Sequence, residues 1–413
     1  MRATKIVATI GPACDAAGVL DRLVAAGTDV ARLNASHSSR ADLERRLAAV
    51  RAASDRAGRH VAVLVDLGGP KLRVGPMADG VVLEAGETFA LVSADITGDA
   101  SAAGVTHEGL AEDVSAGDRI LLDDGAIELR VTSSEPGRVE TLVVTGGGLS
   151  SHKGLNVPGV RLRVEPITER DLDDLEWSLN AGVDMVAQSF VRSADDVRRL
   201  REAMGGRTIP IVAKIEKHEA VADIEGIVLE ADAVMVARGD LGVETSPEEV
   251  PVIQRQVVTA CLAAGRPVIV ATQMLESMVH APRPTRAEAS DVANAVFESA
   301  DAVMLSAETA VGEHPVEAVE TMSRICTRAE AASRPAPPAA VSRGAGDDVT
   351  RAVSAAAARL ADELPIVAIV TATESGGTAR AVAARRPPVP VIAITPDPRI
   401  ARQLSLVRGV SPH

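Results

Sequence analysis

Strand-length apolar runs that each end in polar residues recur along this chain of 413 residues, and this repetition constrains the fold most strongly. Two of the runs, IPIVAKIE and ADAVMVARGD, end at Glu216 and Asp240. The others are TDVARLNASH, HVAVLVDLGG, VDMVAQSF, RPVIVATQ and ADAVMLSAET. A parallel (β/α)8 barrel places catalytic groups at the C-terminal ends of its strands. Because a buried strand does not need Lys214 or Thr272, we expect these polar ends to form a functional site.

The order of the expected strands indicates a barrel interrupted by a lid. Three runs, KIVATI, DVARLN and VAVLVDLG, precede residue 73, and five more strands lie near Met185, Ile209, Ala233, Pro267 and Ala302. Between them, residues 74–159 contain short alternating segments punctuated by Gly and Asp, which predict an all-β insert. We therefore expect an α/β fold, a (β/α)8 TIM barrel over 1–73 and 160–330, with a β-rich lid over 74–159.

The rest of the chain predicts a linker and a small domain. Residues 331–346 are rich in Pro and Ala, as linkers are. Residues 347–413 predict a truncated α/β domain with a helix over 349–363, strands in PIVAIVTAT and VPVIAITPD, and a last helix that ends near Val410. The loop ESGGTAR, residues 374–380, resembles a phosphate-binding loop that lacks the lysine of a P-loop.

Charge and cysteine content exclude several classes of protein. A net charge of −14 argues against general binding to nucleic acid or to anionic membranes. Cys14, Cys261 and Cys326 have no spacing typical of a metal site or a disulfide framework, so we expect reduced thiols. The N-terminus does not read as a signal peptide, and no apolar run is long enough to span a membrane. We therefore expect a cytoplasmic protein.

Paired carboxylates at the ends of successive strands predict a metal site. Glu216 and Asp240 offer hard oxygen ligands, which suit Mg²⁺. Lys214 precedes Glu216 by two residues, so the two side chains share one face of the strand. An ammonium beside a divalent cation is favourable when an anion such as a phosphoryl group or an enolate lies between them. A structural salt bridge between Lys214 and Glu216 is the alternative interpretation.

Further polar residues follow other strands and point to a phosphate-rich substrate. After the second and third strands these are Arg32, Asn34, Ser36, His37, Asp66 and Arg73. At the end of the seventh strand, the Thr272 hydroxyl either contacts substrate and relays a proton through water, or bonds to the backbone. The segment GDLG, residues 239–242, predicts a tight turn before a helix whose N–H groups hold a carboxylate.

Eleven segments of the chain, in this order, resemble the pyruvate kinase family. They are TKIVATIGPA, AGTDVARLNASH, DLGGPKLRVG, LLDDG, KGLNVPG, AGVDMVAQSFVR, AKIEKHEA, VMVARGDLGVE, VIVATQMLESM, PTRAEASDVANAV and SADAVMLSAETAVGEHP. The resemblance runs from Thr4 to about Glu330 and extends loosely into the last domain. It implies a barrel, a β-rich lid and a C-terminal regulatory domain. It also implies the last step of glycolysis, in which phosphoenolpyruvate and ADP give pyruvate and ATP.

The resemblance implies a role for each polar strand end. Mg²⁺ or Mn²⁺ is held by Glu216 and Asp240, and Lys214 stabilises the transferring phosphoryl group. The residues expected to contact phosphoenolpyruvate are Arg32, Lys214, Gly239, Asp240 and Thr272. Those expected on the nucleotide side are Asn34, Ala35, Ser36, His37, Arg73 and, from the lid, Lys153. Arg73 and Thr272 are expected to act in catalysis together with Lys214.

The segment DLGGPK departs from the potassium-dependent members, which read DTKGPE. Lys71 replaces the glutamate and Leu67 the threonine. In that pattern a monovalent cation lies near residues that match Asn34, Ser36, Asp66 and Leu67. Because the Lys71 ammonium is a compact charge on a flexible stem, we expect it to replace the ion, so that K⁺ is not required. The alternative places Lys71 in solvent with the ion still bound.

The family continues well beyond a stretch like RQLSLVRGV, and those residues complete the sheet of the C-terminal domain. Since this chain ends earlier, we expect no activation by fructose 1,6-bisphosphate. We also expect a homodimer or homotetramer whose assembly is altered by the uncovered sheet edge.

Two other functions compete with pyruvate kinase activity. One is a different lyase or transferase of phosphoenolpyruvate on the same barrel, which would not need Lys153 or the other nucleotide-side residues. The other is a non-catalytic protein that binds a sugar phosphate at the ESGGTAR loop. A protein that had lost catalysis would not need to keep its catalytic residues. Their presence argues against this alternative: Lys214, Glu216, Asp240 and Thr272.

Overall fold

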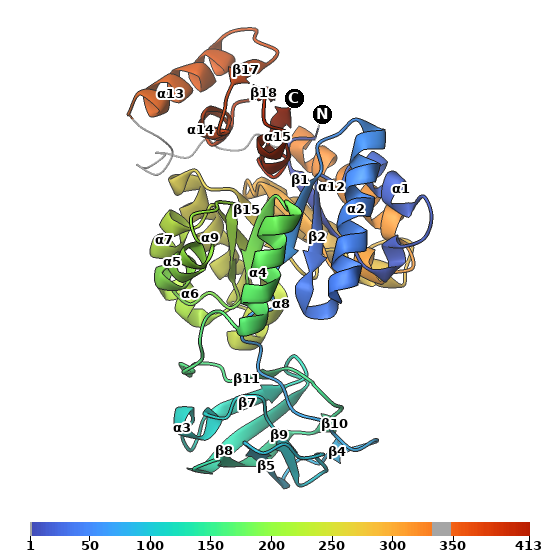
Figure 1. The fold of residues 1–413 in the computed structure, drawn as a ribbon, viewed down its shortest axis with the longest axis vertical. Helices are drawn as coiled ribbons and strands as arrows, with labels where there is room; N and C mark the ends of the chain where they lie inside the picture. Colours follow the sequence, from blue (N-terminus) through green and yellow to red (C-terminus); the bar gives the residue numbers. More distant parts are fainter. Residues whose placement is uncertain (1, 333–347) are drawn as a thin grey trace.

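A computed structural model describes residues 2–332 and 348–413. Figure 1 shows a central barrel with a β-rich lid at one end and the C-terminal α/β domain at the opposite end. The predicted order of barrel, insert, barrel and C-terminal domain is confirmed. Most of the expected linker, residues 333–346, lies outside the described residues, whereas Ala331 and Ala332 belong to the last barrel helix.

Eight parallel strands close into a barrel in the order β1-β16-β15-β14-β13-β12-β3-β2. All of their residues are buried except Asn34, which is partly exposed, and burial on both faces explains why they read as continuous apolar runs. Val7, Leu64, Val212, Met235 and Ile269 belong to the innermost cluster, where aliphatic and Met side chains do the packing. The strands are β1 (Lys5–Thr9), β2 (Val30–Asn34), β3 (Ala62–Asp66), β12 (Met185–Gln188), β13 (Ile211–Ile215), β14 (Ala233–Ala237), β15 (Val268–Ala271) and β16 (Ala302–Leu305).

Helices surround the barrel, and several begin at caps that the sequence provides. Thr168 forms a capping box with Asp171 at α4, and Thr285 forms one with Glu288 at α10. The larger helices are α1 (Val19–Ala26), α2 (Arg40–Ala57), α4 (Glu169–Ala181), α5 (Ala194–Ala203), α9 (Val250–Ala264), α10 (Arg286–Phe297) and α12 (Pro315–Ala332). The shorter ones are α6 (His218–Ala222), α7 (Ile224–Glu230), α8 (Arg238–Glu244) and α11 (Ala307–Ala310), with 3₁₀ turns at Pro12–Cys14, Ala35–His37 and Glu276–Val279.

One local prediction is wrong in this region. The GDLG segment is not a turn that precedes a helix, because helix α8 already begins at Arg238 and contains all four residues. The two glycines of the GDLG segment favoured the prediction of a turn there. The helix forms nevertheless because it is short and its Leu241 side chain is fully buried.

The lid contains a six-stranded sheet in the order β11-β7-β8-β9-β5-β6 and a two-stranded sheet of β10 and β4. In β8, buried and exposed residues alternate, as predicted for a half-buried strand. The elements are β4 (Val82–Leu83), β5 (Thr88–Val92), β6 (Ala102–Gly104), α3 (Leu110–Asp113), β7 (Arg119–Leu122), β8 (Ile127–Glu135), β9 (Arg138–Thr145), β10 (Gly147–Gly148) and β11 (Leu155–Asn156).

The C-terminal domain has three parallel strands in the order β17-β18-β19. The expected end of the last helix near Val410 is wrong, since that helix ends at Leu404 and Val410 begins a strand. Three residues that include Pro412 are too few to show a strand pattern, and pairing with β18 creates the strand. The elements are α13 (Asp348–Glu363), β17 (Ile369–Ala372), α14 (Gly377–Ala383), β18 (Val391–Ile394), α15 (Pro398–Leu404) and β19 (Val410–Pro412).

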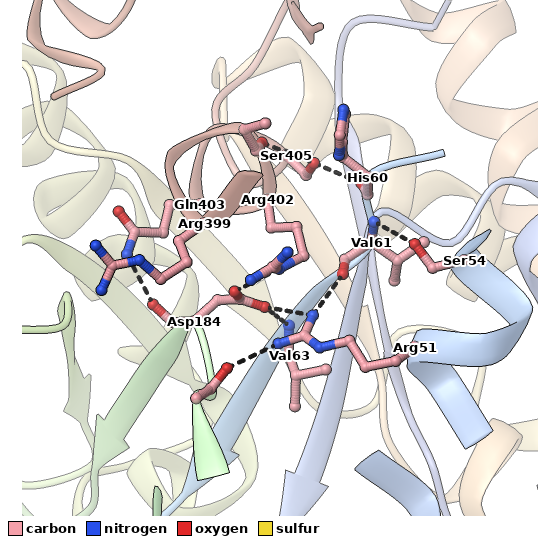
Figure 2. A network of polar contacts seen from close by, with 12 residues as sticks. Arg51, Ser54, His60, Val61, Val63, Asp184, Arg399, Arg402, Gln403 and Ser405 are labelled. Carbon is pink, nitrogen blue, oxygen red and sulfur yellow. Dashed lines mark hydrogen bonds and ion pairs between the residues drawn. The ribbon is translucent and has the colours of Figure 1, made fainter. Parts of the chain in front are cut away.

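The C-terminal domain docks on the barrel through Asp184, a buried residue just before β12 (Figure 2). Its carboxylate accepts from Arg402 Nε of α15 at 2.7 Å and from the Val63 N–H at 2.7 Å, and it pairs with Arg51 Nη1 of α2 at 2.8 Å. Ser405 Oγ adds a bond to the carbonyl of His60 at 2.6 Å. One carboxylate thus joins a barrel strand, a barrel helix and the last helix of the chain.

Replacing Asp184 with asparagine is expected to destabilise the protein by about 2–4 kcal/mol, since two guanidinium groups lose their carboxylate partner and both are partly exposed. The measurement is the urea midpoint, combined with hydrogen exchange in α15. Asp397→Asn is the control, because its ion pair with Arg399 is largely exposed. Equal midpoints for the two variants would contradict a role of Asp184 in docking.

Candidate active site

The predicted residues meet at the C-terminal mouth of the barrel, where they form a chain of alternating charges. Arg32 of β2 lies 2.7 Å from Asp66 Oδ2 at the end of β3. Lys214 Nζ of β13 lies 3.3 Å from Asp66 Oδ1 and 2.8 Å from Glu216 Oε1. All four side chains are at least about nine-tenths buried. The predicted shared face of Lys214 and Glu216 is therefore confirmed.

Ser189 joins this chain, and the sequence analysis missed it. Its hydroxyl accepts from Lys214 Nζ at 2.7 Å and contacts Asp66 Oδ1 at 3.2 Å and the carbonyl of Leu67 at 2.7 Å. Ser189 directly follows β12, so it has the position that identified the other residues. The strand-end pattern in VDMVAQSF was the signal that would have found it.

Lys214 remains charged despite its burial. Burial alone would lower the pKa of its ammonium, but the carboxylates of Asp66 and Glu216 more than offset this and raise it above the ordinary value. Burial likewise opposes ionisation of Asp66, but Lys214 and Arg32 hold the pKa of this carboxyl below its ordinary value. The mouth of the barrel thus presents a permanent buried cation, which suits a substrate with developing negative charge.

Glu216 and Asp240 fit the requirements of a hard divalent cation. Glu216 Oε2 accepts the Phe190 N–H at 2.7 Å, which fixes the carboxylate. Burial raises the pKa of Glu216, and the nearby charge of Asp240 raises it further, against the effect of Lys214. A divalent cation between the two carboxylates would relieve this repulsion. Within residues 2–332 and 348–413 no group of three or more His, Cys, Asp or Glu could hold a metal, and Mg²⁺ commonly completes its coordination with water and substrate oxygens.

Thr272 and Gly239 lie together beside this pair. Thr272 Oγ1 accepts the N–H of Gly239 at 2.7 Å and bonds to the carbonyl of Ala271 at 2.6 Å. The alternative in which the Thr272 hydroxyl bonds to the backbone therefore describes this structure. The Gly239 N–H, which belongs to the segment predicted to hold a carboxylate, donates to Thr272 in this structure.

The backbone at Thr272 is in the left-handed region, with φ values of 67° at Thr272 and 55° at Gln273. For residues that are not Gly this conformation is strained. Arg238 holds it with bonds to the carbonyls of Thr272 at 2.7 Å and Gln273 at 3.2 Å, and with an ion pair to Asp291 at 2.6 Å. Arg238 is thus a supporting residue, although the sequence analysis assigned it no role.

Residues expected to contact the nucleotide form hydrogen bonds with nearby groups of the protein. Asn34 Oδ1 accepts the Ser36 N–H at 3.0 Å, and the carbonyl of Ala35 accepts from Arg170 Nη2 at 2.8 Å. Burial lowers the pKa of His37, and the charges of Arg73 and other cations lower it further. These cations create the positive potential that a polyphosphate requires.

Two further cations of the expected nucleotide side lie at the lid. Arg73 Nη1 donates to the carbonyl of His152 at 3.0 Å, and Lys153 Nζ pairs with Asp123 at 2.8 Å. Both contacts are exposed and lie at the base of the lid or within it. Lys153 would therefore need a new partner to contact a nucleotide.

Three of the four residues of the expected monovalent-ion position lie close together, since Asn34 pairs with Asp66 in the register of β2 and β3 and accepts the Ser36 N–H at 3.0 Å. Leu67 is buried in the core, and Asp66 is bound to Arg32 and Lys214. Lys71 Nζ instead lies 3.6 Å from Asp240 Oδ1. The ammonium thus lies beside a predicted metal ligand, and replacement of the ion by Lys71 stays a prediction.

Lysine is scarce in this chain, and most of the lysines lie near the candidate active site. The chain has 43 basic residues, but its lysines are only Lys5, Lys71, Lys153, Lys214 and Lys217, and all except Lys5 lie at the mouth or the lid base. A lysine carries a compact point charge, whereas arginine serves planar ion pairs. This usage would have identified Lys217, which the sequence analysis did not select.

Two of the cavities that have the size of ligand sites lie where domains meet. One of about 630 Å³ lies between barrel and lid, and Lys71, Asp124, Gly239 and Asp240 are among its lining residues. The other, of about 590 Å³, lies between the barrel and the C-terminal domain and includes Ser375 of the ESGGTAR loop. Five arginines and one acidic residue line the second cavity: Arg201, Arg207, Arg266, Arg380, Arg399 and Asp232.

Cys14, Cys261 and Cys326 are free thiols, and all three are buried. Burial raises the pKa of the Cys14 thiol to about 11, so it stays protonated and inert. In the part of the chain that the structure describes, every helix is too short or too polar to cross a bilayer.

Comparisons with known proteins agree with this geometry. Residues 1–319 match the family model described as "Pyruvate kinase, barrel domain", and residues 351–413 match the one described as "Pyruvate kinase, alpha/beta domain". The chain is 46% identical over 423 residues to a pyruvate kinase of Geobacillus stearothermophilus, which covers 100% of the chain and 72% of that protein.

Two other similar proteins extend the comparison. A pyruvate kinase of Mycobacterium tuberculosis is 46% identical over 415 residues, which cover 99% of the chain and 86% of that protein. A crystal structure of a pyruvate kinase from Cryptosporidium parvum superposes with a TM-score of 0.94 at 35% identity and covers 100% of the chain and 87% of that structure. The likeness therefore includes the lid and the C-terminal domain as well as the barrel.

Proposed function

Because the chain belongs to the pyruvate kinase family, we propose that it transfers the phosphoryl group of phosphoenolpyruvate to ADP with a divalent cation bound at Glu216 and Asp240. The observation that carries this assignment is the buried Lys214 ammonium, which contacts Asp66, Ser189 and Glu216 at the barrel mouth. Bound Mg²⁺ or Mn²⁺ would supply a Lewis acid at the phosphoryl oxygens.

The protein residues have separate roles in this proposal. Lys214 stabilises the charge that develops on the transferring phosphoryl group, and Arg32 orients it. Thr272 and the Gly239 N–H bind the carboxylate of the substrate once it displaces their mutual hydrogen bond. Water near Thr272 delivers a proton to the enolate. The residues proposed to hold the nucleotide are Asn34, Ala35, Ser36, His37, Arg73 and Lys153.

A coupled assay of pyruvate release tests the function. Activity should require phosphoenolpyruvate, ADP and MgCl₂ together, and ATP should form in equal amounts. Consumption of phosphoenolpyruvate without ADP would instead assign a different lyase or transferase on this barrel. A cytoplasmic location and a homodimeric or homotetrameric state belong to the same proposal, and light scattering at assay concentration tests the assembly.

We further expect catalysis without K⁺, because the Lys71 ammonium can supply the single positive charge beside the phosphoryl site. In tetramethylammonium buffer, KCl should change kcat less than about twofold. Lys71→Glu should create a dependence of more than about tenfold, the effect of one fixed charge at a transferring group. Strong KCl activation of the unmutated protein would mean that Lys71 does not replace the ion.

Binding of a phosphorylated small molecule is a second candidate function. It is favoured by the arginine-lined cavity between the barrel and the C-terminal domain. Within the described residues, Arg266 donates to the backbone carbonyl of Leu229 and Arg380 to that of Ser375, and neither guanidinium is paired with a carboxylate. Two such guanidinium groups suit a phosphate. Calorimetry with a sugar monophosphate should show binding that Arg380→Gln weakens at least about tenfold, whereas Arg359→Gln, an exposed control on α13, leaves it unchanged.

A further inference from the structure

The lid joins the barrel through two short segments that are hydrogen-bonded to each other. The Leu155 N–H donates to the carbonyl of Leu72 at 2.9 Å, and the Val74 N–H donates to the carbonyl of Lys153 at 3.0 Å. These bonds make the two segments, residues 71–74 and 153–156, a single stalk at the base of the lid. Each segment also contacts helix α8 of the barrel, through Lys71 in one and Asn156 in the other.

The contact from Asn156 is buried. Its Nδ2 donates to Glu244 Oε1 at 2.7 Å, and Lys217 Nζ lies 2.5 Å from the same oxygen. The Glu244 side chain is only 1% exposed, and its Oε2 has no hydrogen-bond partner within the described residues. A carboxylate this buried depends on each partner it has, so the stalk is held firmly at Asn156.

The buried contact lies next to the proposed metal ligands. Lys217 directly follows Glu216, and Glu244 lies four residues after Asp240, one turn further along α8. Any change in the position of Asn156 relative to Glu244 therefore changes the position of the lid relative to both carboxylates.

The contact that Lys71 makes with α8 is partly exposed, unlike the buried contact of Asn156. Its Nζ lies 3.6 Å from Asp240 Oδ1, and the two side chains are 32% and 29% exposed. An ion pair this exposed is weak. A divalent cation at Asp240 would compete for the same carboxylate and repel the ammonium, so metal binding would weaken this contact.

We propose that α8 sets the position of the lid through these two contacts. Asn156, Glu244 and Lys217 are positioning residues that form a pivot, and Lys71 is a tie that metal binding at Asp240 releases. The release rests on the proposed metal site, whereas the pivot does not. Once released, the Lys71 ammonium can turn towards the phosphoryl group, where the sequence pattern predicts its charge.

The tie can change the lid equilibrium only by its own strength, because a ligand shifts two states by its difference in affinity for them. An exposed ion pair contributes up to about 1 kcal/mol, so its loss changes the lid populations by about fivefold at most. A measurement of populations is therefore more informative than a measurement of stability.

Electron spin resonance can measure the distance between lid and barrel in the full chain. Spin labels would be attached to Ser133→Cys on β8 and Gln256→Cys on α9, both of which are exposed positions. The three native cysteines are buried and should not react. Distance distributions are recorded without metal and with saturating MgCl₂, as defined by a separate calorimetric titration.

MgCl₂ should shift the distribution of the labelled protein. Lys71→Met and Asp240→Asn should show the shifted distribution without metal and should not respond further. Lys153→Met is the matched control, since its ion pair with Asp123 lies within the lid and its loss should not move the lid. If Lys71→Met and Asp240→Asn leave the metal-free distribution unchanged, the tie is overturned. If they shift it but bound MgCl₂ does not, the release is overturned and the metal lies elsewhere.

Asn156→Ala tests the pivot independently of the metal. It should broaden the distance distribution in both conditions and raise KM for ADP by at least about tenfold, the scale of a lost supporting contact. KM for phosphoenolpyruvate should change less than about twofold, because Arg32, Thr272 and Gly239 belong to the barrel. A lower melting temperature with an unchanged distance distribution would assign Asn156 a structural role only and overturn the pivot.

Discussion

Lys214→Met is expected to lower kcat by at least about 10²–10³-fold while ADP still binds, because the methionine fills the space but removes the buried charge that faces the phosphoryl group. The loss should appear in kcat rather than in KM, since the contact strengthens as charge develops in the transition state. Steady-state kinetics with saturating MgCl₂ measures the effect, and calorimetry with ADP checks that the nucleotide side is intact.

Lys214→Arg separates the need for a point charge from the need for any cation. The guanidinium is broader and planar, and it would have to fit among Asp66, Ser189 and Glu216. We expect this variant to fold and to remain well below the activity of the unmutated protein. A Lys214→Met variant within threefold of the unmutated kcat would remove Lys214 from the mechanism.

The strand-end pattern predicted the barrel and the main group of site residues for one physical reason. Parallel strands buried on both faces must be apolar along their length, so polar residues can gather only where the strands end. Lys214, Glu216 and Asp240 are therefore visible from the sequence alone. Ser189 obeys the same rule, and it was missed because serine is common at strand ends and carries no charge.

Contacts between separate parts of the chain could not be predicted in this way. Glu244 lies in the middle of the chain and Asn156 in the lid, and no periodicity links them. The same holds for Asp184 and Arg402, which are 218 residues apart and meet where the C-terminal domain docks. Strand β19 and the helical GDLG segment were missed because their conformations depend on neighbours in space.

The position of Lys71 shows a different limit. Its substitution pattern predicted a charge near the phosphoryl group, whereas the structure places the ammonium at Asp240. The flexible stem of lysine lets the ammonium reach the Asp240 carboxylate. The sequence can therefore indicate that a site contains a positive charge, whereas the position of that charge depends on the groups around it.

Removal of either proposed metal ligand should raise the MgCl₂ concentration that gives half-maximal activity by more than about tenfold, since even an outer-shell partner typically changes metal affinity by 10–100-fold. Glu216→Gln should also lower kcat more than Asp240→Asn does. Glu216 is the direct partner of Lys214 at 2.8 Å, whereas Asp240 is partly exposed and forms its ion pair with the flexible stem of Lys71 at 3.6 Å. Binding of Mn²⁺ to the free protein, followed by spin resonance, gives a readout that does not depend on turnover. Asp124→Asn is the matched control, because Asp124 lines the same cavity and is not a proposed ligand. Unchanged MgCl₂ titrations in both variants would mean that other residues hold the metal.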